Sequence, residues 1–177
     1  LSFACRQESE FKKLRKIEPN RSALIKGEII NRDVYPNTKN LTLSIPDFNG
    51  RKQEILVPID SSGHFRFEFY PIVTREIHLN PIEKVLVISP GDSIYLIKDF
   101  TRLNFTRFRG DNRTLNMNIS RFYRRYRGRY HIDLYNGTKR FEVVLSGLRD
   151  RYMDFLDRYC EMYEVSDQFK RWASKQI

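Results

Sequence analysis

The distribution of proline constrains the fold of this sequence more than any other feature. All seven prolines lie in the first 90 of the 177 residues, and none occurs after them. Proline lacks a backbone N–H and disrupts helix interiors, so the first half favours short strands bounded by turns, whereas the second half can form long helices. The seven positions are Pro19, Pro36, Pro46, Pro58, Pro71, Pro81 and Pro90.

Eight short segments with strand-like patterns follow one another in the first half, separated by polar turns. Phe65, Phe67 and Phe69 alternate with charged residues, which predicts a half-buried strand with an aromatic inner face. Short strands at this regular spacing are typical of an antiparallel β-sandwich. The predicted strands cover residues 24–31, 41–45, 54–59, 65–69, 73–79, 84–89, 93–98 and 103–108.

The second half changes to helical periodicity. An apolar stripe from Leu115 to Tyr126 predicts a helix from about residue 111 to 127. Ser166 is a predicted N-cap for a last short helix that Trp172 anchors. Between them, a second stripe at helical spacing predicts a long helix. That stripe consists of Phe141, Leu145, Leu148, Tyr152, Phe155, Tyr159 and Tyr163.

The fold class expected is therefore α+β, an antiparallel β-sandwich followed by a C-terminal helical segment. We expect a lipobox-like start and tether at residues 1–22, the sandwich domain at 23–110 and the helical segment at 111–177. The aromatic faces of both parts, including Phe155 and Tyr159, should lie inside.

Positive charge is concentrated in one window of the chain. The net charge is +10, from 32 basic and 22 acidic residues, and residues 98–130 hold ten basic residues against two acidic ones. Guanidinium groups pair with phosphate and aromatic rings stack on bases, so the arginines that alternate with aromatic residues here form a candidate polyanion-binding patch. These candidates are Arg121, Arg124, Arg125, Arg127 and Arg129.

A structural interpretation of the same window competes with polyanion binding. Helical spacing places the aromatic residues on one side and the arginines on the other, as on a solvated helix face, and this interpretation is favoured. Nucleic acid is therefore the less favoured partner. Anionic lipid headgroups, a glycan or an acidic protein fit the same charge.

The two cysteines suggest a cellular location for the protein and no obvious reaction. Ala4 and Cys5 resemble the lipobox of bacterial lipoproteins, in which the cysteine carries the lipid, and a charged tether follows to Arg21. Cys5 is therefore the predicted lipid attachment site, with a chance cysteine as the alternative. Cys160 lies in a helical pattern and is expected to be buried and inert.

Candidate catalytic and metal-binding residues are few. His64, His78 and His131 lie far apart, and none stands at the spacing of a catalytic triad or a zinc site. A surface or rim position is expected for His64 and His78. We therefore predict no catalytic residue, no bound metal and no cofactor.

Four short motifs follow one another along residues 24–125. They are a strand containing Gly27, a turn that ends at Gly63, the turn at residues 89–93, and Gly110 at the passage from the last strand into the first helix. Their order resembles the N-terminal region of TlpA-like thiol–disulfide oxidoreductases of gram-negative bacteria, whose thioredoxin domain lies further along the chain. His64 departs from that pattern, because it separates Gly63 from the aromatic strand.

The resemblance implies a role and no activity. Disulfide exchange needs an attacking thiol and a resolving thiol, and this sequence has no Cys-x-x-Cys motif. The implied function is a non-catalytic cell-envelope lipoprotein module, periplasm-facing or at the surface and linked to cell redox homeostasis. Its implied partners are the membrane, through the lipid anchor, and a protein or an attached redox domain. Polyanion binding through residues 98–130 is the alternative, and a redox enzyme whose active part lies beyond residue 177 is a further rival.

Overall fold

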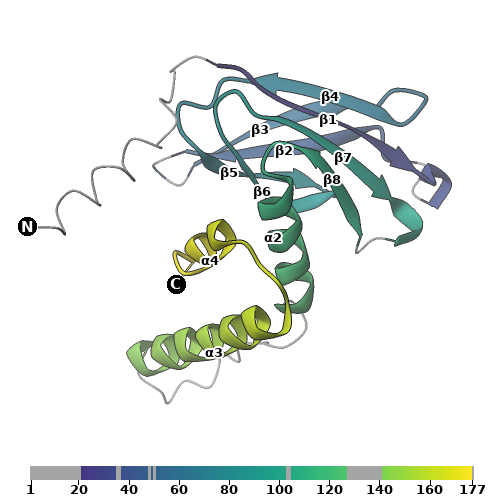
Figure 1. The fold of residues 1–177 in the computed structure, drawn as a ribbon. Coiled ribbons are helices and arrows are strands. Elements are labelled where there is room, and N and C mark those ends of the chain that lie inside the picture. Colours follow the sequence, from purple (N-terminus) through teal and green to yellow (C-terminus); the bar gives the residue numbers. More distant parts are fainter. Residues whose placement is uncertain are drawn as a thin grey trace, which may run out of the picture.

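The computed structural model describes most of the chain, and for Lys84 and residues 141–145 it describes the backbone alone. The described residues form eight β-strands, two short 3-10 helices and three α-helices, so the α+β class is confirmed. Figure 1 shows the strands gathered in one body and the helices on one side of it. The described residues are 21–34, 37–47, 49, 51–102, 105–126 and 141–176.

The first sheet has the strand order β4-β1-β7-β8. Strand β1 runs antiparallel to β4 but parallel to β7, with Ile25 opposite Ile94. The expected all-antiparallel arrangement is therefore wrong at this pair. Parallel neighbours need a long connection, and here the whole second sheet lies between the two strands in sequence. The four strands are β1 (Ala23–Ile30), β4 (His64–Phe69), β7 (Ser93–Asp99) and β8 (Thr106–Gly110).

The second sheet is antiparallel throughout, with the order β3-β2-β5-β6. Its strands are β2 (Asn40–Pro46), β3 (Lys52–Pro58), β5 (Arg75–Asn80) and β6 (Glu83–Ile88). All eight strands lie close to their predicted positions. The last one differs most, because it begins at Thr106 and residues 103 and 104 lie outside the described residues. The 3-10 helices are η1 (Arg32–Val34) and η2 (Phe100–Arg102).

Side chains from both sheets form one buried apolar cluster. Alternate residues point into it, for example Ile25 and Ile94 from the first sheet and Leu43 from the second. Phe65 is buried as predicted, whereas the other two phenylalanines of β4 are half-buried and pack against the edge of the cluster. Gly27 is required here, because a Cβ at this position would meet the backbone of β7 and the ring of Phe65.

Helix α2 (Arg113–Tyr126) lies across the edges of both sheets, where it contacts β6 and β8 (Figure 1). The buried side-chain amide of Asn116 accepts a hydrogen bond from the Val87 amide at 2.7 Å and donates one to the Val87 carbonyl at 3.0 Å. Strand β6 is at the edge of its sheet, so within the described part of the chain these backbone groups have no strand partner on that side. Asn116 takes the place of a neighbouring strand.

Two further helices complete the fold, α3 (Phe141–Met162) and α4 (Asp167–Ala173). The predicted N-cap of α4 is confirmed, because the Ser166 hydroxyl accepts a hydrogen bond from the Phe169 amide at 3.2 Å. Trp172 fastens α4 to the sheet by donating from its indole N–H to the Glu76 carboxylate at 2.8 Å. Among the described helices, none combines the length and apolar character that crossing a membrane requires.

The helices and strand β6 share a second buried cluster, which is rich in aromatic residues. Phe122 lies at its centre, and its ring contacts those of Tyr159, Phe169 and other aromatic residues at centroid distances of 5.3 to 6.5 Å. Val85 and Val87 of β6 point into this cluster, while Leu86 and Ile88 point into the sheet core. The unbroken apolar run of β6 reflects a strand that is buried on both faces.

Candidate functional site

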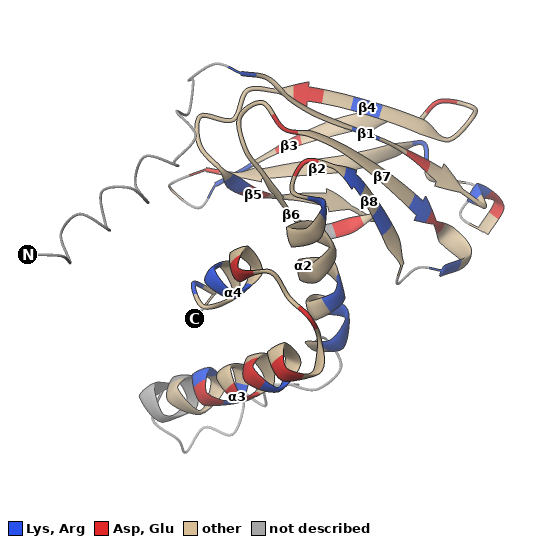
Figure 2. Cartoon of the chain, in the orientation of Figure 1, with Lys and Arg blue, Asp and Glu red and all other residues tan. Residues whose placement is uncertain are grey.

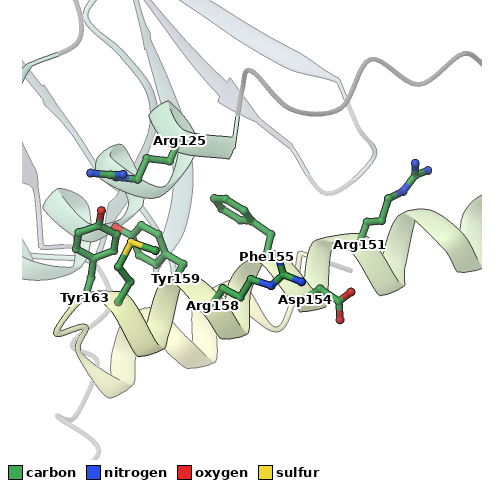
Figure 3. Close-up of a pocket in the computed structure, with 8 residues that line it drawn as sticks. Arg125, Arg151, Asp154, Phe155, Arg158, Tyr159 and Tyr163 are labelled. Carbon is green, nitrogen blue, oxygen red and sulfur yellow. The ribbon is translucent and has the colours of Figure 1, made fainter.

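A cavity of about 360 Å³ lies between helices α2 and α3, within the size range of small-molecule sites. One lining residue comes from α2 and the others come from the second half of α3 and the residue that follows it. Figure 3 shows Tyr159 and Tyr163 at one end below Arg125, with Arg151 toward the other end. The lining residues are Arg125, Arg151, Asp154, Phe155, Arg158, Tyr159, Met162 and Tyr163.

Helical spacing explains why α3 presents these residues together. Arg151, Phe155, Arg158 and Met162 recur at intervals of four, three and four residues, which places them on one side of a helix. The side therefore carries cationic and apolar groups in alternation. The result is an aromatic and thioether floor with guanidinium groups beside it.

Arg125 is held at the cavity wall by its contact with an aromatic ring. Its guanidinium carbon lies 4.5 Å from the centre of the Tyr163 ring, and that of Arg121, one turn earlier on α2, lies 5.8 Å from the same centre. Both distances are within cation–π range. The stacking orients Arg125 and leaves its N–H donors available to an anion.

Tyr159 carries the least satisfied polar group of the cavity. The residue is 2% exposed, and among the described residues its hydroxyl has no hydrogen-bond partner. Burial raises the pKa of Tyr159 to about 12, although the charges of Arg121 and Arg125 act in the opposite direction. The hydroxyl therefore stays protonated at neutral pH and can donate a hydrogen bond. Buried polar groups without a partner are uncommon and costly. Less than 1 Å² of this oxygen is accessible, so the ring of Tyr159 faces the cavity while the hydroxyl lies behind its surface.

The five predicted polyanion-binding arginines do not form one described patch. Arg127 and Arg129 lie outside the described residues. Arg121 and Arg125 face Tyr163, whereas Arg124 donates to the Ser120 carbonyl at 3.2 Å and lies over the Phe105 ring. Figure 2 shows basic residues of α2 gathered toward its C-terminal end.

The sequence interpretation missed the contribution of α3. Arg151, Arg158 and Asp154 come from a segment of balanced charge, so the charge window did not single them out. Tyr159 was expected to be a core residue, and it is, but it also lines the cavity. The signal that could have revealed the site is the arginine spacing on the edge of the aromatic stripe.

A second polar cluster lies beneath α2 and fastens the helix to the strands. Lys98 of β7 is 3% exposed and donates to the Thr106 hydroxyl at 3.3 Å, while the Ser120 hydroxyl donates to Glu83 at 3.1 Å. Burial raises the pKa of Glu83 and lowers that of Lys98, and each charge opposes the shift of the other. Arg124 adds a third charge. These groups hold one another in place and do not open into the cavity.

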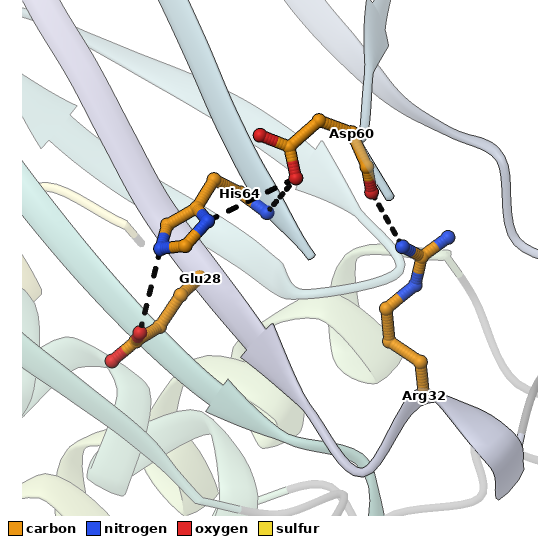
Figure 4. Close-up of polar contacts among 4 residues, drawn as sticks. All are labelled: Glu28, Arg32, Asp60 and His64. Atoms are coloured by element: carbon orange, nitrogen blue, oxygen red, sulfur yellow. Dashed lines mark hydrogen bonds and ion pairs between the residues drawn. The ribbon is translucent and has the colours of Figure 1, made fainter. Parts of the chain in front are cut away.

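His64 belongs to a turn network on the exposed end of β4 (Figure 4). Its ring nitrogens lie 3.8 Å from the carboxylates of Glu28 and Asp60, too far for hydrogen bonds, and its backbone N–H donates to Asp60 at 2.9 Å. Arg32 donates to the Asp60 carbonyl at 2.6 Å. The network stabilises the turn, and the expected surface position of His64 is confirmed.

The other candidate residues do not lie together in one site. His78 is half-buried on β5, and His131 and Cys5 lie outside the described residues. Cys160 is a free thiol whose pKa is raised by burial, but it is half-buried, so the expectation of a fully buried cysteine is wrong. Within the part of the chain that the structure describes, no three His, Cys, Asp or Glu side chains group as metal ligands would.

Comparison with known proteins assigns no family to the chain. No protein-family model matches it, and no curated protein matches it either.

Proposed function

We propose that this chain is a non-catalytic recognition module of a cell-envelope lipoprotein, similar in role to the N-terminal accessory region of TlpA-like oxidoreductases. In this proposal the two sheets form the β-sandwich of such a region, the helices form its recognition surface, and Cys5 carries the lipid anchor. The observation that supports recognition is the cavity between α2 and α3, where three arginines and one carboxylate surround an aromatic floor. Arginine beside aromatic residues is a combination that binding sites use for anionic groups.

The positions of the reactive groups favour recognition over catalysis. His64 stabilises an exposed turn, the Glu83 and Lys98 pair lies beneath α2, and Cys160 is half-buried with a raised pKa. General acid–base or nucleophilic catalysis needs such groups within hydrogen-bond reach of one another around a substrate. Here each is part of a separate structural contact.

The proposed location in the cell envelope is tested on the full natural protein. We expect intact-mass spectrometry to find an acylated Cys5, and we expect Cys5→Ala to move the protein from the membrane fraction to the soluble fraction. Cys160→Ala is the matched control, since it removes the other thiol and should leave the protein in the membrane fraction. An unmodified Cys5 thiol would contradict the anchor and leave the recognition site to be judged separately.

Polyanion binding is the second candidate function, and the exposed basic edge of the first sheet favours it. Arg107 and Arg109 are exposed on β8, and Arg113 is exposed at the start of α2. This candidate predicts oligonucleotide binding that weakens steeply as salt rises. It also predicts loss of that binding when Arg124 and Arg125 are changed to Glu. Absence of binding at low salt would remove it.

A further inference from the structure

We infer that the cavity between α2 and α3 binds a small aromatic carboxylate, with Arg125 holding the acid group and the aromatic floor holding the ring. The inference rests on the proposed recognition role and specifies the chemistry that this cavity recognises. It does not depend on the lipid anchor.

The charge of the lining selects an anion. Three arginines and one aspartate line the cavity, so positive groups exceed negative ones by two. A guanidinium group presents paired N–H donors that match a carboxylate, and such charge-assisted hydrogen bonds are stronger than neutral ones. Arg125 is the best placed, because its contact with Tyr163 fixes its guanidinium at the aromatic end.

The floor of the cavity selects a flat apolar group. Phe155, Tyr159, Met162 and Tyr163 supply it, and Met162 is 67% exposed although its side chain is apolar. Aromatic rings and a thioether pack favourably against a second ring. A ligand ring would cover the exposed apolar surface, and a volume of about 360 Å³ accommodates a one- or two-ring acid.

Tyr159 takes part in the cavity through its ring. Its Oη has less than 1 Å² of accessible surface and donates to no described residue, so the hydroxyl lies behind the cavity surface. Figure 3 shows Arg125 at the same end of the cavity as the rings of Tyr159 and Tyr163. An acid group drawn to Arg125 therefore places the ring of the ligand against these aromatic side chains.

The test uses the probe 2-naphthoate, titrated into the protein by isothermal calorimetry. We expect saturable binding that weakens roughly tenfold or more in Arg125→Gln, because one charge-assisted hydrogen bond is lost. Arg113→Gln is the matched control: it removes the same charge from an exposed position on the same helix and should leave the affinity unchanged. The neutral analogue 2-naphthamide should bind much more weakly than 2-naphthoate.

Tyr159→Phe tests whether the buried hydroxyl takes part in binding. We expect it to leave the affinity for 2-naphthoate unchanged, because Oη has less than 1 Å² of accessible surface, and not to lower the melting temperature of the free protein, since the hydroxyl has no described partner to lose. Equal losses in Arg125→Gln and Arg113→Gln, or equal affinity for 2-naphthamide, would overturn the inference. No binding of 2-naphthoate at millimolar concentration would also overturn it, while an acylated Cys5 would still support the envelope role.

Discussion

Glu83 and Lys98 show how the surroundings of a single residue set its contribution to stability. Both are charged residues placed under α2, where water is largely excluded, and each depends on the other and on Arg124 for compensation. Removing one member of a buried pair leaves the other charge buried without a partner. Replacing both by apolar or neutral groups costs much less stability. The pair is therefore a structural unit that single substitutions disturb more than a double one.

Lys98→Met is predicted to lower the free energy of unfolding at neutral pH by roughly 3 kcal/mol, because it leaves the Glu83 carboxylate buried without the positive charge that acts on it most strongly. The double variant Glu83→Gln/Lys98→Met should cost clearly less than the sum of the two single changes. Urea unfolding of the four proteins measures this. Additive costs would show that the two side chains do not interact.

The raised pKa of Glu83 predicts a specific pH dependence. The folded protein holds this proton more tightly than the unfolded chain does, so stability falls as pH rises from the ordinary glutamate pKa of 4.5 through the raised folded value. We expect Glu83→Gln to remove this pH-dependent loss of stability, measured as the free energy of urea unfolding at several pH values in that window. An unchanged pH profile in Glu83→Gln would place the titrating group elsewhere.

At the scale of elements, the contact of α2 with an edge strand decides how the helices join the sheets. Asn116 is fully buried and bonds both backbone groups of Val87. Gly110 sits at the passage from β8 into α2 with a positive φ of 87°, and a Cβ there would meet the Ser93 carbonyl. Gly110, which is part of the sequence resemblance, and Asn116 thus have structural roles that are independent of any activity.

Asn116→Ala is predicted to destabilise the protein by roughly 3 kcal/mol, since it leaves a backbone N–H and a carbonyl of β6 buried and unpaired. Asn118→Ala is a matched control on the same helix: its side chain is 1% exposed, and its amide nitrogen has no partner among the described residues. We expect Asn118→Ala to cost much less in thermal or urea unfolding. Similar costs would mean that packing volume, and not the Asn116 bonds to β6, holds α2.

The elements were predictable from the sequence to the extent that local patterns determine them. Short apolar runs and alternating apolar residues, bounded by polar turns, located all eight strands, and the helical stripes located the described helices. The parallel pairing of β1 with β7 was not predictable, because no local pattern records which distant strand lies alongside. The cavity was missed for a similar reason: Arg125 joins Arg151 and Arg158 only after α2 and α3 pack together.

For the molecule as a whole, two buried clusters meet at β6. One lies between the sheets and the other joins β6 to the helices, and Trp172 adds a hydrogen bond from α4 to Glu76 on β5. Because β6 contributes to both clusters, loss of one should expose apolar residues of the other. The strands and the helices are therefore expected to unfold together.

Trp172 is the single tryptophan of the chain, and its fluorescence reports on the helical cluster. We predict that its urea unfolding transition coincides with the one seen by far-ultraviolet circular dichroism, which includes the strands. A fluorescence transition at clearly lower urea would mean that the helices detach while the sheets stay folded. The Trp172→Phe variant, which lacks the reporter, verifies the origin of the signal.

The most direct test of the recognition site is an NMR measurement that locates bound 2-naphthoate on the protein. Nuclear Overhauser contacts from the naphthoate protons to the side chains of Tyr159, Met162 and Tyr163 are the result we predict. At a probe concentration that half-saturates the unmodified protein, they should weaken strongly in Arg125→Gln and keep their intensity in Arg113→Gln. Contacts confined to the exposed arginines of β8, or none to the α2–α3 cavity at saturating probe, would contradict the site.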